Sequence, residues 1–288
     1  MSILSITENN MLKVAITGSS GLVGSRIVQL LGERCSFIPL SHKELDITDK
    51  KNITLTLGKL DFDIFLHLAA YTNVDGAEKD KKTAFDINVT GTRNVYESTR
   101  DLGKKFIYIS TGFVFDGRNP PYTEDSKPNP ISYYGQTKYE GETMLANKAM
   151  IVRIDYPYRA YYESKRDFVR TIKYLLEQKK PLQMVTDSLF TPTYIDDIAY
   201  SLDYLMNHFS PEIFHIIGGN SLSPYEAGLC IAKSFGLDKS LITLTYYQNY
   251  FAGKAKRPQY AELKSKRNTF YRMRTFQEGL DNMKKNLL

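Results

Sequence analysis

Hydrophobic positions in the first half of the chain form short continuous runs that alternate with longer amphipathic stretches. The apolar runs are rich in β-branched residues and cover residues 12–17, 36–40, 63–68, 105–110 and 150–154. Runs of this kind are typical of parallel strands that are covered on both faces. Helical patterns lie between them, at 22–31, 51–59, 83–101 and 132–148. The alternation predicts βαβ units and hence an α/β fold, a Rossmann-type doubly wound parallel sheet.

After about residue 155 the alternation is less regular. Helical patterns are found at 167–178, 195–208 and 223–235, with a short strand at 213–217, and residues 251–288 are polar and rich in tyrosine. The chain contains no internal repeat. We therefore predict a first domain over residues 11–155, completed by about residues 190–220, and a smaller lobe formed by residues 156–189 and 221–288.

The composition is that of a globular protein whose charge is unevenly distributed. Hydrophobic residues make up 42% of the 288 positions and charged residues 24%, which excludes a disordered or collagen-like chain. The net charge is +6, but residues 251–288 alone carry ten basic and three acidic side chains, a net +7. Residues 1–250 therefore sum to −1, which does not fit an evenly basic nucleic-acid-binding protein. We predict no nucleic-acid partner.

Neither export nor a membrane span is indicated. Cys35 and Cys230 both stand in apolar contexts, where buried reduced thiols are expected. Residues 1–10 lack the basic and apolar regions of a signal peptide, and no stretch approaches the roughly 20 apolar residues of a spanning helix. We expect a cytoplasmic protein without a membrane partner.

Three glycines follow the first predicted strand, where a helical pattern begins. Gly18, Gly21 and Gly24 are spaced as G-x-x-G-x-x-G. The first glycine allows a tight turn, the second lets a pyrophosphate approach the backbone, and the third permits close packing of helix and strand. The N-terminus of the helix then faces the anion. This setting favours a dinucleotide site over a glycine-rich turn without a ligand.

The end of the second predicted strand bears on the choice of cofactor. It reads PLSHK at 39–43, without the acidic residue that would hold an unphosphorylated adenosine ribose. Lys43, or Arg26 on the first helix, could instead meet a 2′-phosphate, and the alternative for both is solvated surface charge. NADP(H) is therefore the preferred cofactor, with NAD(H) as the second choice.

Five further segments carry a specific resemblance. They read LDITD (45–49), HLAAYTNVDGAE (67–78), ISTGFVFDG (109–117), PYTE (121–124) and YGQTKYEGE (134–142). With these motifs the chain resembles the extended short-chain dehydrogenases/reductases, and among them the dTDP-4-dehydrorhamnose reductases. It is also similar to their relatives, the regulatory β subunits of methionine adenosyltransferase. The resemblance runs from about Met11 to Lys266 and is interrupted around residues 160–184.

The resemblance assigns catalytic roles to three residues. The Tyr-x-x-x-Lys pattern occurs four times in the chain, but only Tyr134 follows the Ser-Thr strand and begins a predicted helix. There the i, i+4 spacing puts Tyr134 and Lys138 on one face. By resemblance, Tyr134 donates a proton, Thr111 hydrogen-bonds the carbonyl oxygen, and Lys138 holds the nicotinamide ribose. We expect the Lys138 ammonium to lower the pKa of Tyr134.

The resemblance also implies cofactor and substrate contacts. The cofactor contacts are Gly18, Gly21, Leu22, Val23, Asp46, Ile47, Ala69, Ala70, Tyr71, Asn88, Tyr134 and Lys138, although Asn88 has a helix-capping or packing role as an equal alternative. The substrate contacts are Val74, Asp75, Thr111, Phe113, Tyr156 and Arg257. Arg257 is expected to reach a substrate diphosphate, and the other bases of residues 251–288 to form a solvated face. We predict no metal site.

Several departures from the reductases concern the sugar pocket. Their Thr-Asp-Tyr is Thr111-Gly112-Phe113 here, their tryptophan is replaced by Tyr156, and a loop glycine is replaced by Phe190. We expect an NADP(H)-dependent reductase of a nucleotide-linked 4-keto-6-deoxy sugar, and a homodimer is compatible with the resemblance. The alternatives are an NADP-binding regulatory subunit that partners methionine adenosyltransferase, and a nucleotide-sugar epimerase or dehydratase.

Overall fold

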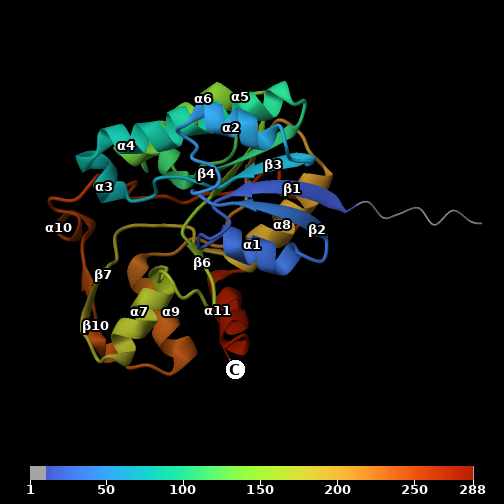
Figure 1. Ribbon diagram of the computed structural model, residues 1–288. Helices are drawn as coiled ribbons and strands as arrows, with labels where there is room; N and C mark the ends of the chain where they lie inside the picture. Colours follow the sequence, from blue (N-terminus) through green and yellow to red (C-terminus); the bar gives the residue numbers. More distant parts are fainter. Residues whose placement is uncertain (1–10, 288) are drawn as a thin grey trace, which may run out of the picture.

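A parallel sheet organises the first half of the chain in the computed structural model, which describes residues 11–287 (Figure 1). Residues 1–10, where no signal peptide is expected, and residue 288 lie outside the described residues. The six strands run in the order β2-β1-β3-β4-β5-β9, each parallel to its neighbours. Their bounds are β1 Leu12–Thr17, β2 Cys35–Leu40, β3 Ile64–His67, β4 Lys105–Thr111, β5 Met150–Ile154 and β9 Ile213–His215. The predicted doubly wound sheet is confirmed.

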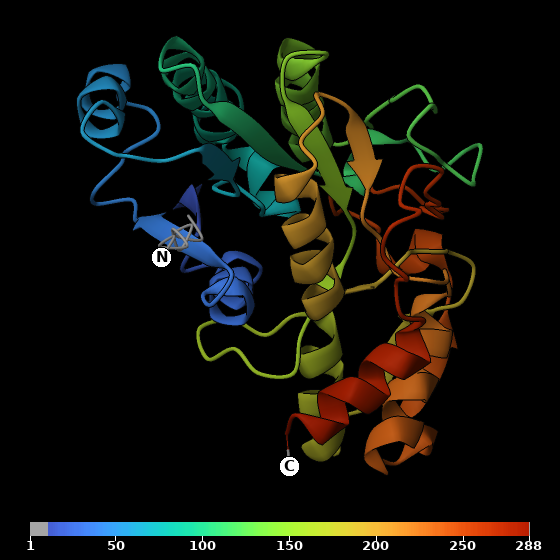
Figure 2. The ribbon, with the colours of Figure 1, turned by 90° about the vertical axis from the view of Figure 1, so that its right-hand side faces the viewer.

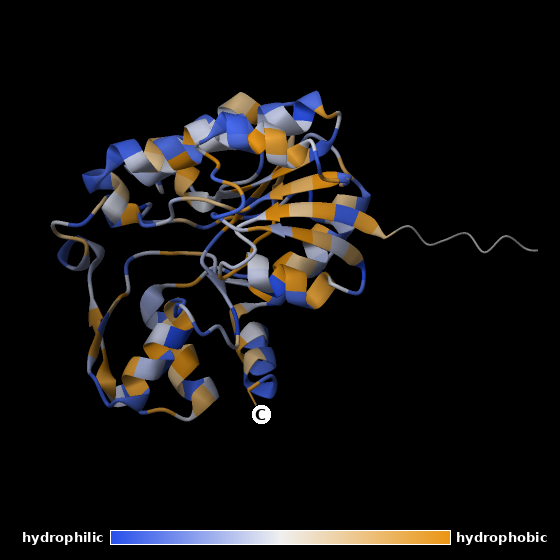
Figure 3. Ribbon diagram, viewed as in Figure 1, coloured by the Kyte–Doolittle hydropathy of each residue, from blue (hydrophilic) through white to orange (hydrophobic). Residues whose placement is uncertain are grey.

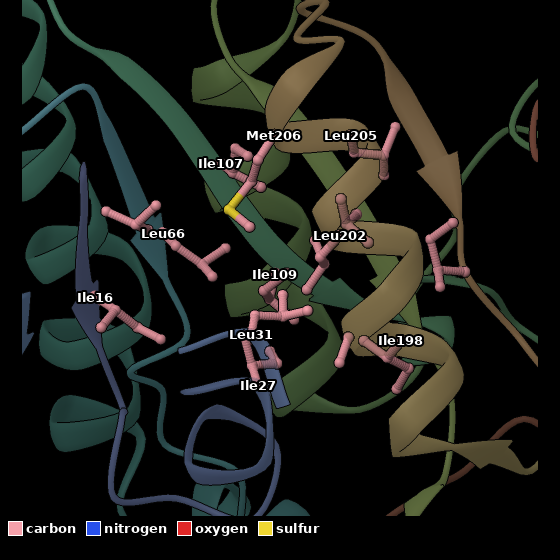
Figure 4. Packing of buried hydrophobic residues seen from close by; sticks show 14 of the residues in the cluster. Ile16, Ile27, Leu31, Leu66, Ile107, Ile109, Ile198, Leu202, Leu205 and Met206 are labelled. Carbon is pink, nitrogen blue, oxygen red and sulfur yellow. The ribbon is translucent and has the colours of Figure 1, made fainter. Parts of the chain in front are cut away.

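Helices cover both faces of this sheet (Figure 1). One layer contains α1 (Gly24–Leu31) and α8 (Ile195–Asn207), and the other contains α2 (Lys50–Leu57), α5 (Thr92–Asp101) and α6 (Tyr133–Leu145). The strands are strongly apolar (Figure 3) because both of their faces are buried. Figure 4 shows Leu31 of α1 and Leu202 of α8 packed against sheet residues such as Ile109.

A smaller unit lies below the sheet in Figures 1 and 2. It contains α7 (Phe168–Glu177), α9 (Pro224–Phe235), α11 (Phe276–Lys285) and the parallel pair β7 (Leu182–Val185) and β10 (Ile242–Thr245). A further parallel pair, β6 (Pro157–Tyr158) and β8 (Thr193–Tyr194), leads into it. We did not predict α11 from the sequence, because residues 251–288 are mainly polar. Thr275 and Glu278 nevertheless form a capping box at the start of this helix. No helix within residues 11–287 has the length and apolar character needed to cross a membrane.

The helix predicted over 83–101 is divided in the structure. After α3 (Val74–Lys79) come α4 (Lys81–Phe85), a π-helical turn at Asp86–Gly91 and then α5. The turn contains Asn88, whose side-chain amide donates to Thr137 of α6 (2.9 Å) and whose Oδ1 accepts from the N–H of Tyr71 (2.8 Å). Such π-turns are frequent at functional sites. The remaining short helices are Gly112–Val114, Lys239–Leu241 and α10 (Tyr247–Tyr250).

Three basic residues of the C-terminal segment form ion pairs with aspartates of earlier segments. Lys266 and Arg267 both pair with Asp125, at 3.0 and 3.2 Å, and Arg274 pairs with the buried Asp197 of α8. The expectation of a solvated basic face still describes Lys266, whose side chain is 61% exposed, but it is wrong for Arg274, which pairs with a carboxylate that is 1% exposed. Sequence could not reveal the pairing, because the partners are separated by 77 to 142 positions.

A buried ion pair joins α6 to β5, the strand beside the edge strand β9. Arg153 of β5 and Glu142 of α6 are 1% and 3% exposed, and two hydrogen bonds of 2.9 and 2.6 Å connect them. Arg153 also contacts Nε2 of His215 on β9 (3.2 Å) and stacks over Phe115. The fork-to-fork geometry offsets part of the cost of burying both charges.

Removing the Glu142 carboxylate should leave the Arg153 guanidinium buried without a counter-charge. We expect Glu142→Ala to lower the free energy of unfolding by roughly 3–5 kcal/mol, measured by urea denaturation. Glu97→Ala is the matched control, because Glu97 pairs with Lys50 at the surface and such a pair contributes about 1 kcal/mol or less. Equal losses in the two variants would contradict the importance of the buried pair.

Candidate active site

A deep cleft opens at the carboxyl ends of the strands, where parallel α/β sheets bind their ligands. Its volume is about 1030 Å³, which is at the upper end for a small-molecule site. The cleft passes the point between β1 and β3 where the strand order reverses. Most of the predicted cofactor residues line it, namely Gly18, Gly21, Leu22, Val23, Asp46, Ile47, Ala69, Ala70, Tyr134 and Lys138.

The glycine loop has the backbone geometry of a dinucleotide site. Gly18 has a φ of +69° and packs so closely on Leu68 that a Cβ would lie 2.9 Å from the carbonyl carbon of Leu68. Among residues 11–287, no acceptor is found for the backbone N–H groups of Leu22 and Val23, just before α1. Free N–H groups at a helix N-terminus are suited to a phosphate. The loop therefore fits a dinucleotide pyrophosphate.

The far end of the cleft contains Ser41, His42, Asp46 and Ile47. The Asp46 carboxylate accepts from the N–H and hydroxyl of Thr48, which holds the pKa of Asp46 below its usual value. Arg26 does not reach this end, because two hydrogen bonds of 2.7 and 2.6 Å hold it to Asp196 of α8. The expectation for Arg26 as a 2′-phosphate ligand is therefore wrong, while Lys43 is exposed and outside the cleft lining.

Tyr71 and Asn88 lie behind the cleft wall rather than on it. Asn88 is completely buried and brackets the backbone of Tyr71, accepting from its N–H and donating to its carbonyl oxygen (3.1 Å). This bracket fixes the segment after β3 that carries Ala69 and Ala70. The position agrees with the packing alternative for Asn88.

One loop that lines the cleft was missed by sequence reasoning. It spans residues 159–167, and its Lys165 and Arg166 are basic side chains on the cleft wall. The Tyr162 hydroxyl donates to the Ser20 carbonyl oxygen in the glycine loop (2.6 Å), and Arg159 donates to Leu22 and Ser25. The loop falls where the family resemblance is interrupted. A cluster of four arginine and lysine residues over 159–170 was the available signal.

Thr111, Tyr134 and Lys138 converge on one wall of the cleft. Thr111 ends β4, and the other two lie one turn apart on α6, where Tyr134 is 8% and Lys138 3% exposed. The Lys138 ammonium donates to the Ile109 carbonyl oxygen (2.8 Å) and sits 4.1 Å from the centre of the Tyr108 ring. The structure therefore brings the three predicted catalytic residues together.

Close approach of α6 to β4 sets this arrangement. Ser132 caps the helix by accepting from the N–H of Gly135 (3.2 Å). A Cβ at position 135 would collide with the Phe113 carbonyl oxygen just after β4, and one at Gly141 would lie 2.6 Å from the Tyr108 hydroxyl. Only glycine at these positions lets the helix lie so near the strand that Tyr134 reaches Thr111.

Burial dominates the pKa values of the predicted catalytic side chains. It raises the pKa of Tyr134 to about 12, although an interaction with the Thr111 hydroxyl lowers it in part. It also lowers the pKa of Lys138 to about 7. The expectation that Lys138 lowers the Tyr134 pKa is therefore wrong in this structure, because a low-dielectric setting disfavours the charged form of both groups.

Aromatic side chains separate the cleft from a second cavity of about 520 Å³. Phe113 and Tyr156 line both, and Tyr156 packs against Phe190 with ring centres 4.8 Å apart. Tyr156 has a φ of +37°, a strained conformation for a bulky residue that is found mainly at functional sites. The substituted positions of the sugar pocket thus form one wall.

Asp75 and Arg257 line the second cavity, whereas Val74 and Thr111 line the main cleft. Arg257 donates to both carboxylate oxygens of Asp75, at 2.6 and 3.3 Å, and this partner holds the pKa of Asp75 below its usual value. Lys254 also lines the cavity, with its ammonium 3.8 Å from the centre of the Tyr250 ring. Arg166 lines it as well, so the cavity combines aromatic walls with three basic groups.

The family of the chain follows from a match to a known family model over almost its whole length. A family model described as the RmlD substrate binding domain matches residues 12–288. The chain belongs to this family. The predicted membership of the extended short-chain dehydrogenases/reductases, in the group of dTDP-4-dehydrorhamnose reductases, is confirmed.

Named relatives include proteins with different activities. Spore coat polysaccharide biosynthesis protein SpsK of Bacillus subtilis (strain 168) is 32% identical, over 88% of this chain and 89% of its own. A crystal structure of dTDP-4-dehydrorhamnose reductase from Bacillus anthracis strain Ames, in complex with NADP, superposes with a TM-score of 0.88 at 31% identity, over 96% and 99% of the two chains. Methionine adenosyltransferase 2 subunit beta of Bos taurus is 30% identical, over 79% and 73%.

The RmlD-family chain has a further carboxyl group in its cleft that sequence reasoning did not single out. Asp155 follows β5, lines the cleft and is 1% exposed. Its Oδ2 accepts from the Thr191 N–H (3.2 Å), and Oδ1 has no hydrogen-bond partner within residues 11–287. Burial without a basic partner raises the pKa of Asp155 to about 8. Within the same residues, His, Cys, Asp and Glu form no group of three that could hold a metal ion.

The raised pKa makes the stability of the protein depend on pH through Asp155. In the unfolded chain this carboxyl has a pKa of about 4, so folding takes up a proton between about pH 4 and pH 8. Wild-type stability should fall as pH rises through this window, whereas Asp155→Asn cannot titrate. We expect the free energy of unfolding of the variant to gain on the wild type by roughly 1 kcal/mol per pH unit, levelling above pH 8.

Urea denaturation of the two proteins from pH 5 to pH 9 measures this difference. Other titrating groups cancel between them, because only residue 155 changes. A difference that stays constant across the range would show that Asp155 is ionised in the folded protein at neutral pH.

Proposed function

We propose that this chain, an NAD(P)-dependent oxidoreductase by family, reduces a nucleotide-linked 4-keto-6-deoxy sugar with NADPH. The convergence of Thr111, Tyr134 and Lys138 beside the glycine loop, in one cleft, carries the proposal. The relatives support the substrate class, since several are named dTDP-4-dehydrorhamnose reductase, and one of these was solved with NADP.

In the proposed reaction, bound NADPH supplies a hydride to the C4 carbonyl carbon. The carbonyl π electrons move to oxygen, which takes the proton of the Tyr134 hydroxyl. Thr111 donates a hydrogen bond to the same oxygen and so stabilises its growing negative charge. The tyrosinate regains a proton from solvent, and the products are NADP⁺ and the alcohol.

The high pKa of Tyr134 suits this direction of reaction. A phenol with a pKa of about 12 remains protonated at neutral pH and is therefore ready to donate. The developing alkoxide is more basic than the phenolate, so proton transfer to it is favourable. Lys138, held by the Ile109 carbonyl oxygen, is placed to bind the nicotinamide ribose and to stabilise the tyrosinate after transfer.

We place the nucleotide and diphosphate of the substrate in the second cavity. Arg257 and Lys254 supply positive charge there, and Tyr247, Tyr250 and Phe251 supply surfaces on which a base could stack. Asp75 holds the Arg257 guanidinium in place until a diphosphate competes for it. In this proposal residues 156–189 and 221–288 form the substrate-binding lobe, and residues 11–155, completed by 190–220, bind the cofactor.

Oxidation of NADPH in the presence of dTDP-4-dehydrorhamnose tests the proposal. We expect the wild type to turn over, and Tyr134→Phe to lower kcat by about 10²–10⁴-fold because the proton donor is lost. The dissociation constant for NADPH should change little, since the substitution removes one hydroxyl. Tyr260→Phe is the matched control, as Tyr260 begins another Tyr-x-x-x-Lys and is half-exposed away from the cleft. Wild-type turnover no faster than that of Tyr134→Phe would refute the proposal.

A regulatory subunit is the second candidate, because the named relatives include methionine adenosyltransferase β chains. It predicts that the chain co-purifies with a methionine adenosyltransferase and changes its kinetics, an effect that Tyr134→Phe leaves intact. Under the reductase proposal, we expect no such effect. A dehydratase would instead release water from dTDP-glucose without net oxidation of NADPH.

A further inference from the structure

The carboxyl group of Asp155 occupies a position beside the catalytic threonine. A Cβ added at Gly112, the residue after Thr111, would lie 2.9 Å from Oδ1 of Asp155 and 3.2 Å from its Cγ. The carboxyl thus fills the space that a side chain at position 112 would take. Thr111 and Ile154 are paired across β4 and β5, so the residues that follow them leave the sheet side by side.

Within residues 11–287, the hydrogen-bonding capacity of this carboxyl is only partly used. Oδ2 accepts from the Thr191 N–H, and Oδ1 is buried without a partner among the described residues. The titratable groups that face it are Tyr134 from α6 and Tyr156 beside it, whose pKa values it helps to raise. A buried polar atom without a partner is costly, and such atoms in native structures call for an explanation.

A ligand bound in the cleft could supply the hydrogen-bond partner that Oδ1 of Asp155 lacks. Asp155 lines the cleft with Thr111, Tyr134 and Tyr156. The Cβ–Cγ torsion of an aspartate is broad, so the carboxyl can turn toward a ligand that binds in the cleft. With Oδ2 accepting from Thr191, the neutral acid carries its proton on Oδ1 and can donate it in a hydrogen bond.

We propose that Asp155 determines substrate specificity by donating a hydrogen bond from Oδ1 to a sugar oxygen next to the carbonyl that Thr111 and Tyr134 address. The inference rests on the proposed function, because it needs a sugar at that wall. Glycine at position 112 is needed for this role, since a side chain there would displace the Asp155 carboxyl. The donor is available while the acid is neutral and is lost when it ionises, at a pKa of about 8.

Two substitutions separate this role from a structural one. Asp155→Asn keeps a donor that does not titrate and can still accept from Thr191, whereas Asp155→Ala removes both functions. Above pH 8 we expect kcat/KM for dTDP-4-dehydrorhamnose to show a fall in the wild type that is absent from Asp155→Asn, so that the ratio of the two proteins changes there. Titration of Lys138, whose pKa is about 7, affects both proteins alike and cancels in this ratio. Asp155→Ala should raise KM by about 10–100-fold at pH 7.

Binding measurements that need no turnover complete the test. By calorimetry with NADP⁺-loaded protein, we expect Asp155→Ala to weaken dTDP-rhamnose by about 10–100-fold while the affinity for dTDP, which lacks the sugar, is unchanged. Equal weakening of both ligands, or of neither, or an unaltered pH profile in Asp155→Asn, would overturn the role of Asp155. If wild-type protein binds dTDP-rhamnose no more tightly than dTDP, the proposed function itself fails.

Discussion

The short distance between α6 and β4 is the constraint on which the rest of the site depends. Glycine at 135 and 141 lets the helix lie where any side chain would collide with Phe113 or Tyr108. The buried pair of Glu142 and Arg153 then holds the same helix to β5. Because Tyr134 and Lys138 project from this helix and Thr111 from the facing strand, packing of α6 determines the catalytic geometry.

Burial that positions these side chains also sets their protonation. The pKa of Tyr134 rises, that of Lys138 falls and that of Asp155 rises, each because a charged form is disfavoured away from water. Tyr134 and Asp155, both neutral at pH 7, suit a reaction in which negative charge develops on a carbonyl oxygen and is quenched by a proton. The burial that is unfavourable for these polar groups thus gives them the protonation states that the proposed reaction needs.

The sequence gives the net charge of the C-terminal segment but does not show which acidic residues its basic side chains meet in the fold. Its net +7 suggested one diphosphate ligand and a solvated remainder. Folding pairs Lys266 and Arg267 with Asp125 at the surface, and Arg274 with the buried Asp197. Arg257 lies at the second cavity, where it binds Asp75. These partners are far apart in sequence, so no local pattern could report them.

The sequence by itself predicted the sheet and the glycine loop, because continuous apolar runs and turn glycines are local patterns with local causes. The resemblance to the reductases named Thr111, Tyr134 and Lys138, which lie on one wall of the cleft. The sequence could not predict α11, the division of residues 83–101 by a π-turn, or the loop at 159–167 that covers the glycine loop. Only the tertiary structure placed Asp155 beside Gly112 and Arg26 on Asp196. Such contacts, and the pKa values that follow from burial, depend on which distant segments meet.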